Sequence, residues 1–240
     1  RNTLTPCGHT AVNNHIHNYS RIRRTYRSAV SVVGVGCRVA HNLIHDAPHM
    51  ALGLIGNDHV FEYNEVYNVC LETDDAGAFY MGRDWTARGN VIRYNYFHHL
   101  GPPSTLLHGT QGIYLDDWSS GTTVYGNVCY KMYMGVLVGG GRNNTVENNI
   151  FVDCKYAVQV DSRGLGWAKY YFDGTNNTLV ERLEAVPYKE PPWSTRYPEL
   201  LTLYEDEPAL AKYNQVVRNI AVDNQQWLRL LDNLADPIVT

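Results

Sequence analysis

The chain of 240 residues is 44% apolar and 18% charged, a composition that excludes a disordered protein and is typical of a soluble domain with a sizeable core. The net charge of −4 does not favour nucleic acid as a partner, and no apolar run is long enough to span a bilayer, so we expect neither nucleic acid nor a membrane partner. The chain carries no visible signal peptide, and its first residues, RNTLTPCGHT, resemble the interior of a fold, so we expect the C-terminal part of a longer protein.

A short pattern recurs from the N-terminus onward: an apolar residue, two variable residues, an asparagine, one variable residue and another apolar residue. The repeated asparagines are Asn14, Asn42, Asn64, Asn95, Asn127, Asn149 and Asn219. Their shortest spacing is 22 residues, which is typical of one turn of a parallel β-solenoid whose longer turns carry insertions. An asparagine at the same corner of every turn can hydrogen-bond to its equivalents. We therefore predict an all-β, right-handed parallel β-helix that forms a single domain over residues 1–240.

A second apolar strand follows the asparagine in most turns, as in GAFYMG, GIYLDD, GVLVGG and AVQVDS. The repeat is interrupted near residues 165–215 by a segment rich in aromatic residues and prolines. Within this segment ERLEA and PELLTLYEDEPALAKY can each form a short helix. We expect a partly helical or irregular insertion that acts as a cap or as a wall of the functional site.

Several histidines belong to the repeat. His17, His45 and His98 each stand three residues after a repeat asparagine, where other turns carry tyrosine, so we expect them to form a ladder. We therefore predict no metal site and no cofactor, and we keep His49 and His59 as candidates for an active face. The five cysteines show no CxxC spacing and are expected to be buried thiols.

Acidic residues crowd two consecutive turns, ETDDAGAFYMGRDW at 72–85 and GIYLDDWSSG at 112–121. Alternation along the strands aligns Phe79 and Met81 with Ile113 and Leu115 as inward residues, with one extra residue, Gly82, forming a bulge. Two outward groups then lie side by side: Tyr80, Arg83, Asp84 and Trp85 from the first turn, and Tyr114, Asp116, Asp117 and Trp118 from the second.

The same two turns have the longest insertions between the asparagine and the second strand, which we expect to form the walls of a groove. Paired carboxylates beside tyrosine and tryptophan favour sugar chemistry. Aromatic rings pack on pyranose faces, and two carboxyl groups can act as general acid and as nucleophile or base.

The runs ETDDAGAFYMGRDWTARGNVIRYNYFHH and GIYLDDWSSGTTVYGN resemble the bacterial β-helix enzymes of glycoside hydrolase family 141, with similarity over roughly residues 10–165. The resemblance implies a secreted or periplasmic fucosidase- or xylanase-type enzyme acting on plant cell-wall glycans, with Asp75 and Asp116 as the catalytic pair. A straight segment would separate these two residues by about 20 Å, so the loop at Asp75 must fold back. If it does not, Asp84 with Asp116 or Asp117 is the better pair.

The remaining candidates receive binding roles in this hypothesis. Asp74, Asp84 and Asp117 would tune the pair, Arg83 and His59 would bind hydroxyls or a carboxylate, and Tyr80, Tyr114, Trp85 and Trp118 would shape the groove. Two alternatives stay open. One is a polysaccharide lyase or uronate epimerase, which neutralises a uronate carboxylate with Ca²⁺ or with arginine and lysine. The acids could hold Ca²⁺, and Asp161 with Arg163 on a later turn adds to this cluster. The other is a non-catalytic glycan-binding β-helix.

Overall fold

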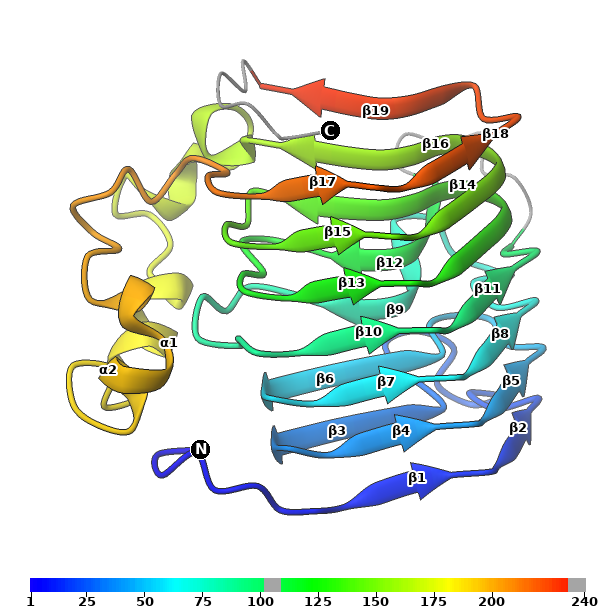
Figure 1. Cartoon of the computed structure of the whole chain (residues 1–240), viewed down its shortest axis with the longest axis horizontal. Helices are drawn as coiled ribbons and strands as arrows, with labels where there is room; N and C mark the ends of the chain where they lie inside the picture. Colours follow the sequence, from blue (N-terminus) through cyan, green and yellow to red (C-terminus); the bar gives the residue numbers. More distant parts are fainter. Residues whose placement is uncertain (102–108, 233–240) are drawn as a thin grey trace.

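The computed structural model describes residues 1–101 and 109–232, which form a parallel β-helix (Figure 1). Each turn of the coil contributes strands to three faces, and every strand pair in the described residues is parallel. The first face consists of β1 (Thr10–Val12), β4 (Arg38–Ala40), β7 (Val60–Glu62), β10 (Val91–Arg93), β13 (Thr123–Tyr125), β15 (Thr145–Glu147) and β17 (Gln215–Val217).

Two further faces complete the coil. The second face consists of β2 (His15–His17), β5 (Leu43–His45), β8 (Glu65–Tyr67), β11 (Tyr96–His98), the first parts of β14 (Val128–Gly139) and β16 (Ile150–Asp161), and β18 (Ile220–Val222). The third face consists of β3 (Val30–Val35), β6 (Leu52–Asn57), β9 (Ala76–Met81), β12 (Thr110–Leu115), the later parts of β14 and β16, and β19 (Gln226–Leu231). The strands β14 and β16 therefore bend around a corner and link the second face to the third.

The predicted asparagine ladder runs along the corner between the first and second faces. Asn64 shows its geometry: its Nδ2 donates to Asn95 Oδ1 at 2.9 Å and to the Val39 carbonyl at 3.0 Å, while its Oδ1 accepts from the backbone N–H of Asn42 at 3.1 Å. Asn42 Nδ2 also donates to this oxygen, at 2.8 Å. The side chains thus satisfy backbone groups that the bend removes from the sheet, and they fix the register of successive turns.

A second ladder, which sequence analysis missed, lies at the corner before the first face. The Cys37 backbone N–H donates to His59 Nδ1 at 3.0 Å, and the His59 N–H donates to Asn90 Oδ1 at 3.1 Å. In later turns the Thr122 N–H donates to Asn144 Oδ1 at 3.0 Å. A side chain at this position therefore binds the backbone of the neighbouring turn, as in the first ladder.

The predicted inward residues form the core: Phe79, Met81, Ile113 and Leu115 are buried in one hydrophobic cluster inside the coil. The predicted histidine ladder is also confirmed. The His45 ring stacks on His17 with ring centroids 5.2 Å apart, and further tyrosine and histidine rings continue the stack on the next turns. The five cysteines are free thiols, four of them buried.

The insertion lies beside the loops that connect the third face to the first (Figure 1). It contains η1 (Arg163–Leu165), η2 (Lys169–Tyr171), α1 (Thr178–Glu184), α2 (Trp193–Arg196) and η3 (Pro198–Leu200). The ERLEA segment lies largely in α1 as predicted, whereas PELLTLYEDEPALAKY forms only η3 and turns. The Tyr197 hydroxyl donates to the Arg88 carbonyl at 3.2 Å, and Arg182 Nη1 donates to the Arg83 carbonyl at 2.8 Å. Among the described residues, no helix has the length and apolar character needed to cross a membrane.

The asparagine ladder predicts a position-dependent loss of stability. Replacing buried Asn95 with alanine leaves the Asn64 N–H and the Phe61 carbonyl without this partner, and we expect a loss of about 3 kcal/mol, because each buried unsatisfied group costs about 1–3 kcal/mol. Urea denaturation measures this loss. The control is Asn14→Ala at the exposed end of the ladder, which removes only the bond from Asn14 Nδ2 to Asn42 Oδ1, keeps the backbone N–H that also donates to Asn42, and should cost about 1 kcal/mol. Equal losses in the two variants would contradict a ladder that stabilises through buried backbone groups.

Candidate active site

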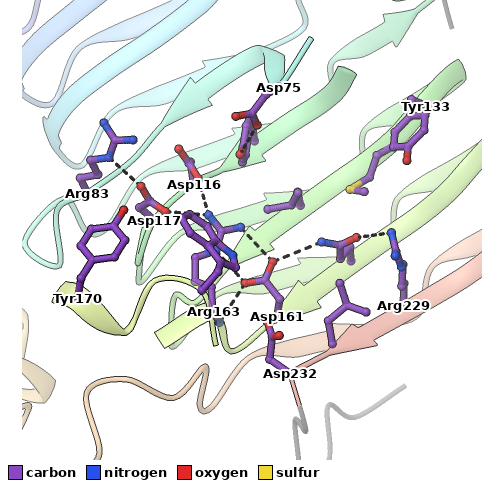
Figure 2. Close-up of a pocket in the computed structure, with 16 residues that line it drawn as sticks. Asp75, Arg83, Asp116, Asp117, Tyr133, Asp161, Arg163, Tyr170, Arg229 and Asp232 are labelled. Carbon is purple, nitrogen blue, oxygen red and sulfur yellow. Dashed lines mark hydrogen bonds and ion pairs between the residues drawn. The ribbon is translucent and has the colours of Figure 1, made fainter. Parts of the chain in front are cut away.

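The outer surface of the third face forms the floor of a cleft of about 650 Å³, a volume typical of ligand sites. The parallel register places one outward residue from each of five neighbouring strands in a single row: Tyr80, Tyr114, Leu137, Gln159 and Arg229. Figure 2 shows this cleft with the side chains that line it. The other lining residues are Asp75, Arg83, Asp116, Asp117, Tyr133, Met134, Asp161, Arg163, Trp167, Tyr170, Leu231 and Asp232.

The guanidinium of Arg163, at the start of the insertion, lies among three buried carboxylates (Figure 2). Its Nη1 donates to Asp116 Oδ1 at 2.7 Å and to Asp117 Oδ1 at 2.8 Å, and its Nε and Nη2 donate to the two oxygens of Asp161 at 2.8 and 3.0 Å. Gly139 makes room for this arrangement, since a Cβ there would lie 2.2 Å from Arg163 Nη2. The guanidinium therefore fills the space above a glycine and bridges the turns on either side of it.

Two tyrosines hold two carboxylates across adjacent turns. Tyr80 and Tyr114 are register partners with ring centroids 5.5 Å apart in an edge-to-face arrangement. The Tyr80 hydroxyl donates to Asp116 Oδ2 at 2.9 Å, and the Tyr114 hydroxyl donates to Asp75 Oδ1 at 2.8 Å. Each tyrosine thus binds the carboxylate of the neighbouring turn, which fixes the orientation of both carboxylates toward the cleft.

The electrostatics of the site distinguish Asp116 from an ordinary carboxyl group. Burial, followed by the charge of Asp117, raises the pKa of Asp116 above its usual value, although Arg163 and the Tyr80 hydrogen bond act in the opposite direction. Burial alone would lower the pKa of Arg163, but its bonds to Asp161 and the nearby Asp116 raise that pKa well above the usual range. The site therefore combines a permanent cation with a carboxyl group whose pKa lies above its usual value.

Most of the predicted site residues meet at this cleft. Asp75, Arg83, Tyr114, Asp116, Asp117, Asp161 and Arg163 line it, and Tyr80 contacts it through Asp116. The Asp75 side chain is within reach of the Tyr114 hydroxyl, so the loop does bring this carboxylate over the strands. Part of the second predicted groove wall, residues 102–108, lies outside the described residues.

The predicted bulge at Gly82 is wrong. The Asp116 N–H donates to the Met81 carbonyl at 2.8 Å, and the Arg83 N–H donates to the Asp117 carbonyl at 2.7 Å. Gly82 therefore lies beside Asp116, and Arg83 lies beside Asp117 rather than Asp116. The register continues one step beyond the strand end, and Arg83 Nε donates to Asp117 Oδ2 at 2.7 Å.

Trp85, Trp118 and Asp84 do not reach the cleft, contrary to the prediction. Trp85 and Trp118 are 1% and 0% exposed, because the insertion covers the loops that carry them. Asp84 turns away and accepts from the Thr86 hydroxyl and from Arg1 Nη1 at 3.2 Å. These positions exclude Asp84 as a partner for Asp116, and the two tryptophans anchor the insertion instead of forming the groove.

His59 and Asp74 also lie outside the cleft lining. His59 is fully buried, and both its Nδ1 and its backbone N–H serve the second corner ladder, which explains its position. His49 is likewise buried and does not line the cleft. Neither of the two histidines kept as active-face candidates therefore lines the cleft.

Sequence analysis missed several residues that line the cleft: Tyr133, Gln159, Trp167, Tyr170, Arg229 and Asp232. A signal for two of them was present, since Gln159 and Arg229 each stand ten residues after a repeat asparagine, as Leu137 does. Trp167 and Tyr170 come from the insertion, which has no repeat and so gives no such signal.

Comparison with known proteins agrees with this architecture. A family model described as right handed beta helix region matches residues 4–180, well over half of the chain. The chain therefore belongs to the right-handed β-helix family, whose fold is common among carbohydrate-active enzymes. Neither a curated protein nor a solved structure gave a match.

The arrangement around Arg163 predicts a pH-dependent loss of stability. In Arg163→Met three buried carboxylates lose their cation, and we expect a loss of about 3–5 kcal/mol near neutral pH. Without the cation the pKa of Asp116, which burial and the charge of Asp117 already raise, rises further above that of the unfolded chain, so the deficit shrinks as the pH falls toward about 4.5 and this group is protonated. Urea denaturation at the two pH values measures the effect.

Arg83→Met serves as the control, because this side chain is half exposed and its bond to Asp117 should contribute less than about 1 kcal/mol. A loss in Arg163→Met that is the same at both pH values would show that packing, not charge, is what the variant removes.

Proposed function

We propose that the protein is a glycoside hydrolase that cleaves plant cell-wall-type poly- or oligosaccharides, as in the enzymes of glycoside hydrolase family 141 that its motifs resemble. The observation that carries this proposal is the crossed pairing of Tyr80 with Asp116 and of Tyr114 with Asp75, which orients two carboxylates from adjacent turns toward one cleft. A pair of carboxyl groups at one cleft is what glycoside hydrolysis requires.

The electrostatics support a division of the two roles. We assign Asp116 as the general acid, because burial raises its pKa, which is the direction required of a group that protonates the glycosidic oxygen. Asp75 is the nucleophile or the base that activates water. It is exposed, and the hydroxyl of Tyr114 occupies only one of its oxygens. The separation of the two carboxyl groups in a sugar complex decides between these mechanisms, about 5–5.5 Å for retention and about 6.5–9.5 Å for inversion.

Aromatic side chains supply the binding surface for the sugar rings. Tyr133, Trp167 and Tyr170 line the cleft, and Trp167 is 63% exposed. Exposed aromatic rings bury apolar area when they pack against a pyranose face. A substrate of this class lies outside the cell, which agrees with our proposal of a secreted or periplasmic bacterial enzyme.

The lyase or epimerase alternative has weaker support from the site. Its calcium ion would need the oxygens of Asp116, Asp117 and Asp161, and all three carboxylates are already bound to Arg163. In the described parts of the chain, no group of three or more histidine, cysteine or acidic side chains is arranged to hold a metal ion. These side chains therefore do not fit a calcium ion, and their arrangement favours the hydrolase over the lyase or epimerase.

Amide substitutions test the catalytic pair. We expect Asp116→Asn and Asp75→Asn each to lower kcat on a plant-glycan panel by about 100-fold to 10,000-fold, because each removes a proton-transfer or nucleophilic group. Asp84→Asn is the matched control, since Asp84 lies outside the cleft and should leave the rate within about twofold. Full activity in Asp116→Asn would remove Asp116 from the mechanism. Binding without turnover in the wild type would favour the non-catalytic alternative.

The pH dependence tests the role of Asp116 as the acid. The Tyr80 hydroxyl stabilises the charged form of Asp116, so Tyr80→Phe raises the pKa of Asp116 further. The acid must be protonated in the free enzyme, so the alkaline limb of kcat/KM should move to higher pH in this variant. Tyr133→Phe is the control, because Tyr133 lines the same cleft but forms no bond to Asp116. A limb that moves to lower pH in Tyr80→Phe contradicts the assignment.

A further inference from the structure

Arg229 lines the part of the cleft opposite Arg83, and Gln159 separates its guanidinium from the carboxylate of Asp161 (Figure 2). Arg229 belongs to β19, and the strand order β12, β14, β16, β19 places it three strands from the turn of Asp116. At about 4.8 Å per strand this is a separation of about 14 Å along the coil. Arg229 therefore lies beyond the sugar at the cleaved bond.

Arg229 is positioned by neutral groups. Its Nη1 donates to Gln159 Oε1 at 3.2 Å, and its guanidinium lies over the Tyr156 ring, 4.7 Å from the ring centroid. Gln159 Nε2 in turn donates to Asp161 Oδ2 at 3.3 Å, which directs the amide oxygen of Gln159 toward Arg229. Within residues 1–101 and 109–232, Arg229 forms no ion pair.

A second cation lies beside the same aromatic residues. Lys155 Nζ is 4.7 Å from the Tyr133 ring centroid and 5.3 Å from that of Tyr156. Tyr133 lines both the cleft and an adjoining hollow of about 590 Å³ that Lys155 also lines. Asp153 borders this hollow, but in the described part of the chain it forms no ion pair with Lys155.

The cations around the cleft therefore differ in whether carboxylates neutralise them. At the catalytic end every arginine is neutralised, Arg163 by three carboxylates and Arg83 by Asp117. Arg229 lies against the ring of Tyr156, and Lys155, which lines the adjoining hollow, lies against Tyr133. Asp232, which follows β19, also lines the cleft, but in the described residues neither cation forms an ion pair. An anionic group would be repelled by the carboxylates at the catalytic end and attracted by Arg229 and Lys155.

We propose that Arg229 and Lys155, with Tyr133 and Tyr156, form an acid-sugar subsite that binds the carboxylate of a uronate in the substrate. This proposal rests on the proposed function and narrows its substrate to uronate-bearing glycans. The planar guanidinium suits a carboxylate, because its remaining N–H groups can donate two parallel hydrogen bonds. The tyrosine rings provide an apolar surface for the sugar ring.

The same charge distribution fixes the direction of the bound chain. The sugar at the cleaved bond lies beside Asp75 and Asp116, where a second carboxylate would be unfavourable. The uronate lies toward β19, at Arg229, and the chain runs along the coil axis across the row of outward residues. The subsite thus binds the substrate at a distance from the chemistry, which makes Arg229 a specificity-determining residue and not a catalytic one.

Matched probes test the subsite directly. The probes are short oligogalacturonates and glucuronate-substituted xylo-oligosaccharides, each compared with its own carboxyl-reduced form, and binding is measured by calorimetry with Asp116→Asn to prevent turnover. We expect one acidic series to bind about tenfold tighter than its reduced form, with a preference that weakens as salt is added. Arg229→Met and Lys155→Met should each remove much of this preference and leave binding of the reduced form unchanged.

Arg218→Met is the control, because Arg218 is an exposed arginine that pairs with Glu147 and does not line the cleft. Equal affinity for the acidic and reduced forms in both series, or an equal loss for both forms in Arg229→Met, overturns the subsite.

Hydrolysis by the wild type, measured on the same probes, distinguishes the two proposals. Cleavage that depends on Asp116 but ignores the carboxylate leaves the hydrolase standing and overturns the subsite. Binding that prefers the acidic form through Arg229, without cleavage of any probe, leaves the subsite standing and overturns the hydrolase.

Discussion

The parallel register of the turns is the constraint on which the rest of the structure depends. Buried asparagine side chains hydrogen-bond to the next turn's asparagine and to backbone groups, so no turn can slip without leaving polar groups unsatisfied. Register places equivalent outward residues about 4.8 Å apart. The row from Tyr114 to Arg229, which forms the cleft floor, follows directly from this spacing.

The cleft also depends on the insertion, which supplies the cation at its centre. Arg163 reaches Asp116 and Asp161 only because Gly139, between them, has no side chain. Trp85 and Trp118 pack against the insertion, and this packing holds its first turns against the coil. A segment that looks like an interruption of the repeat therefore completes the site.

The sequence predicted what the repeat determines. The spacing of the asparagines predicted the turns of the coil. The alternation of side chains along each strand correctly placed Phe79 and Ile113 inside the coil, because this alternation depends only on neighbouring residues in the sequence. The prediction failed where contacts between distant segments determine whether a side chain is buried. Trp118 would be exposed in an isolated turn, and it is buried only by a segment some fifty residues later in the chain. The structural role of His59 could have been predicted from the sequence. His59 stands five residues before a repeat asparagine, as Asn90 does before Asn95, and this shared spacing indicates the second ladder.

Asp116 and Asp117 are neighbours in the sequence, but they accept hydrogen bonds from different groups. Asp117 accepts from two guanidinium groups, those of Arg83 and Arg163, whereas Asp116 accepts from Arg163 and from the neutral hydroxyl of Tyr80. Burial raises the pKa of Asp116, and the negative charge of the adjacent Asp117 raises this pKa further. Arg83 binds Asp117 without contacting Asp116, so an exposed arginine at the cleft helps to position the carboxylate whose charge acts on Asp116.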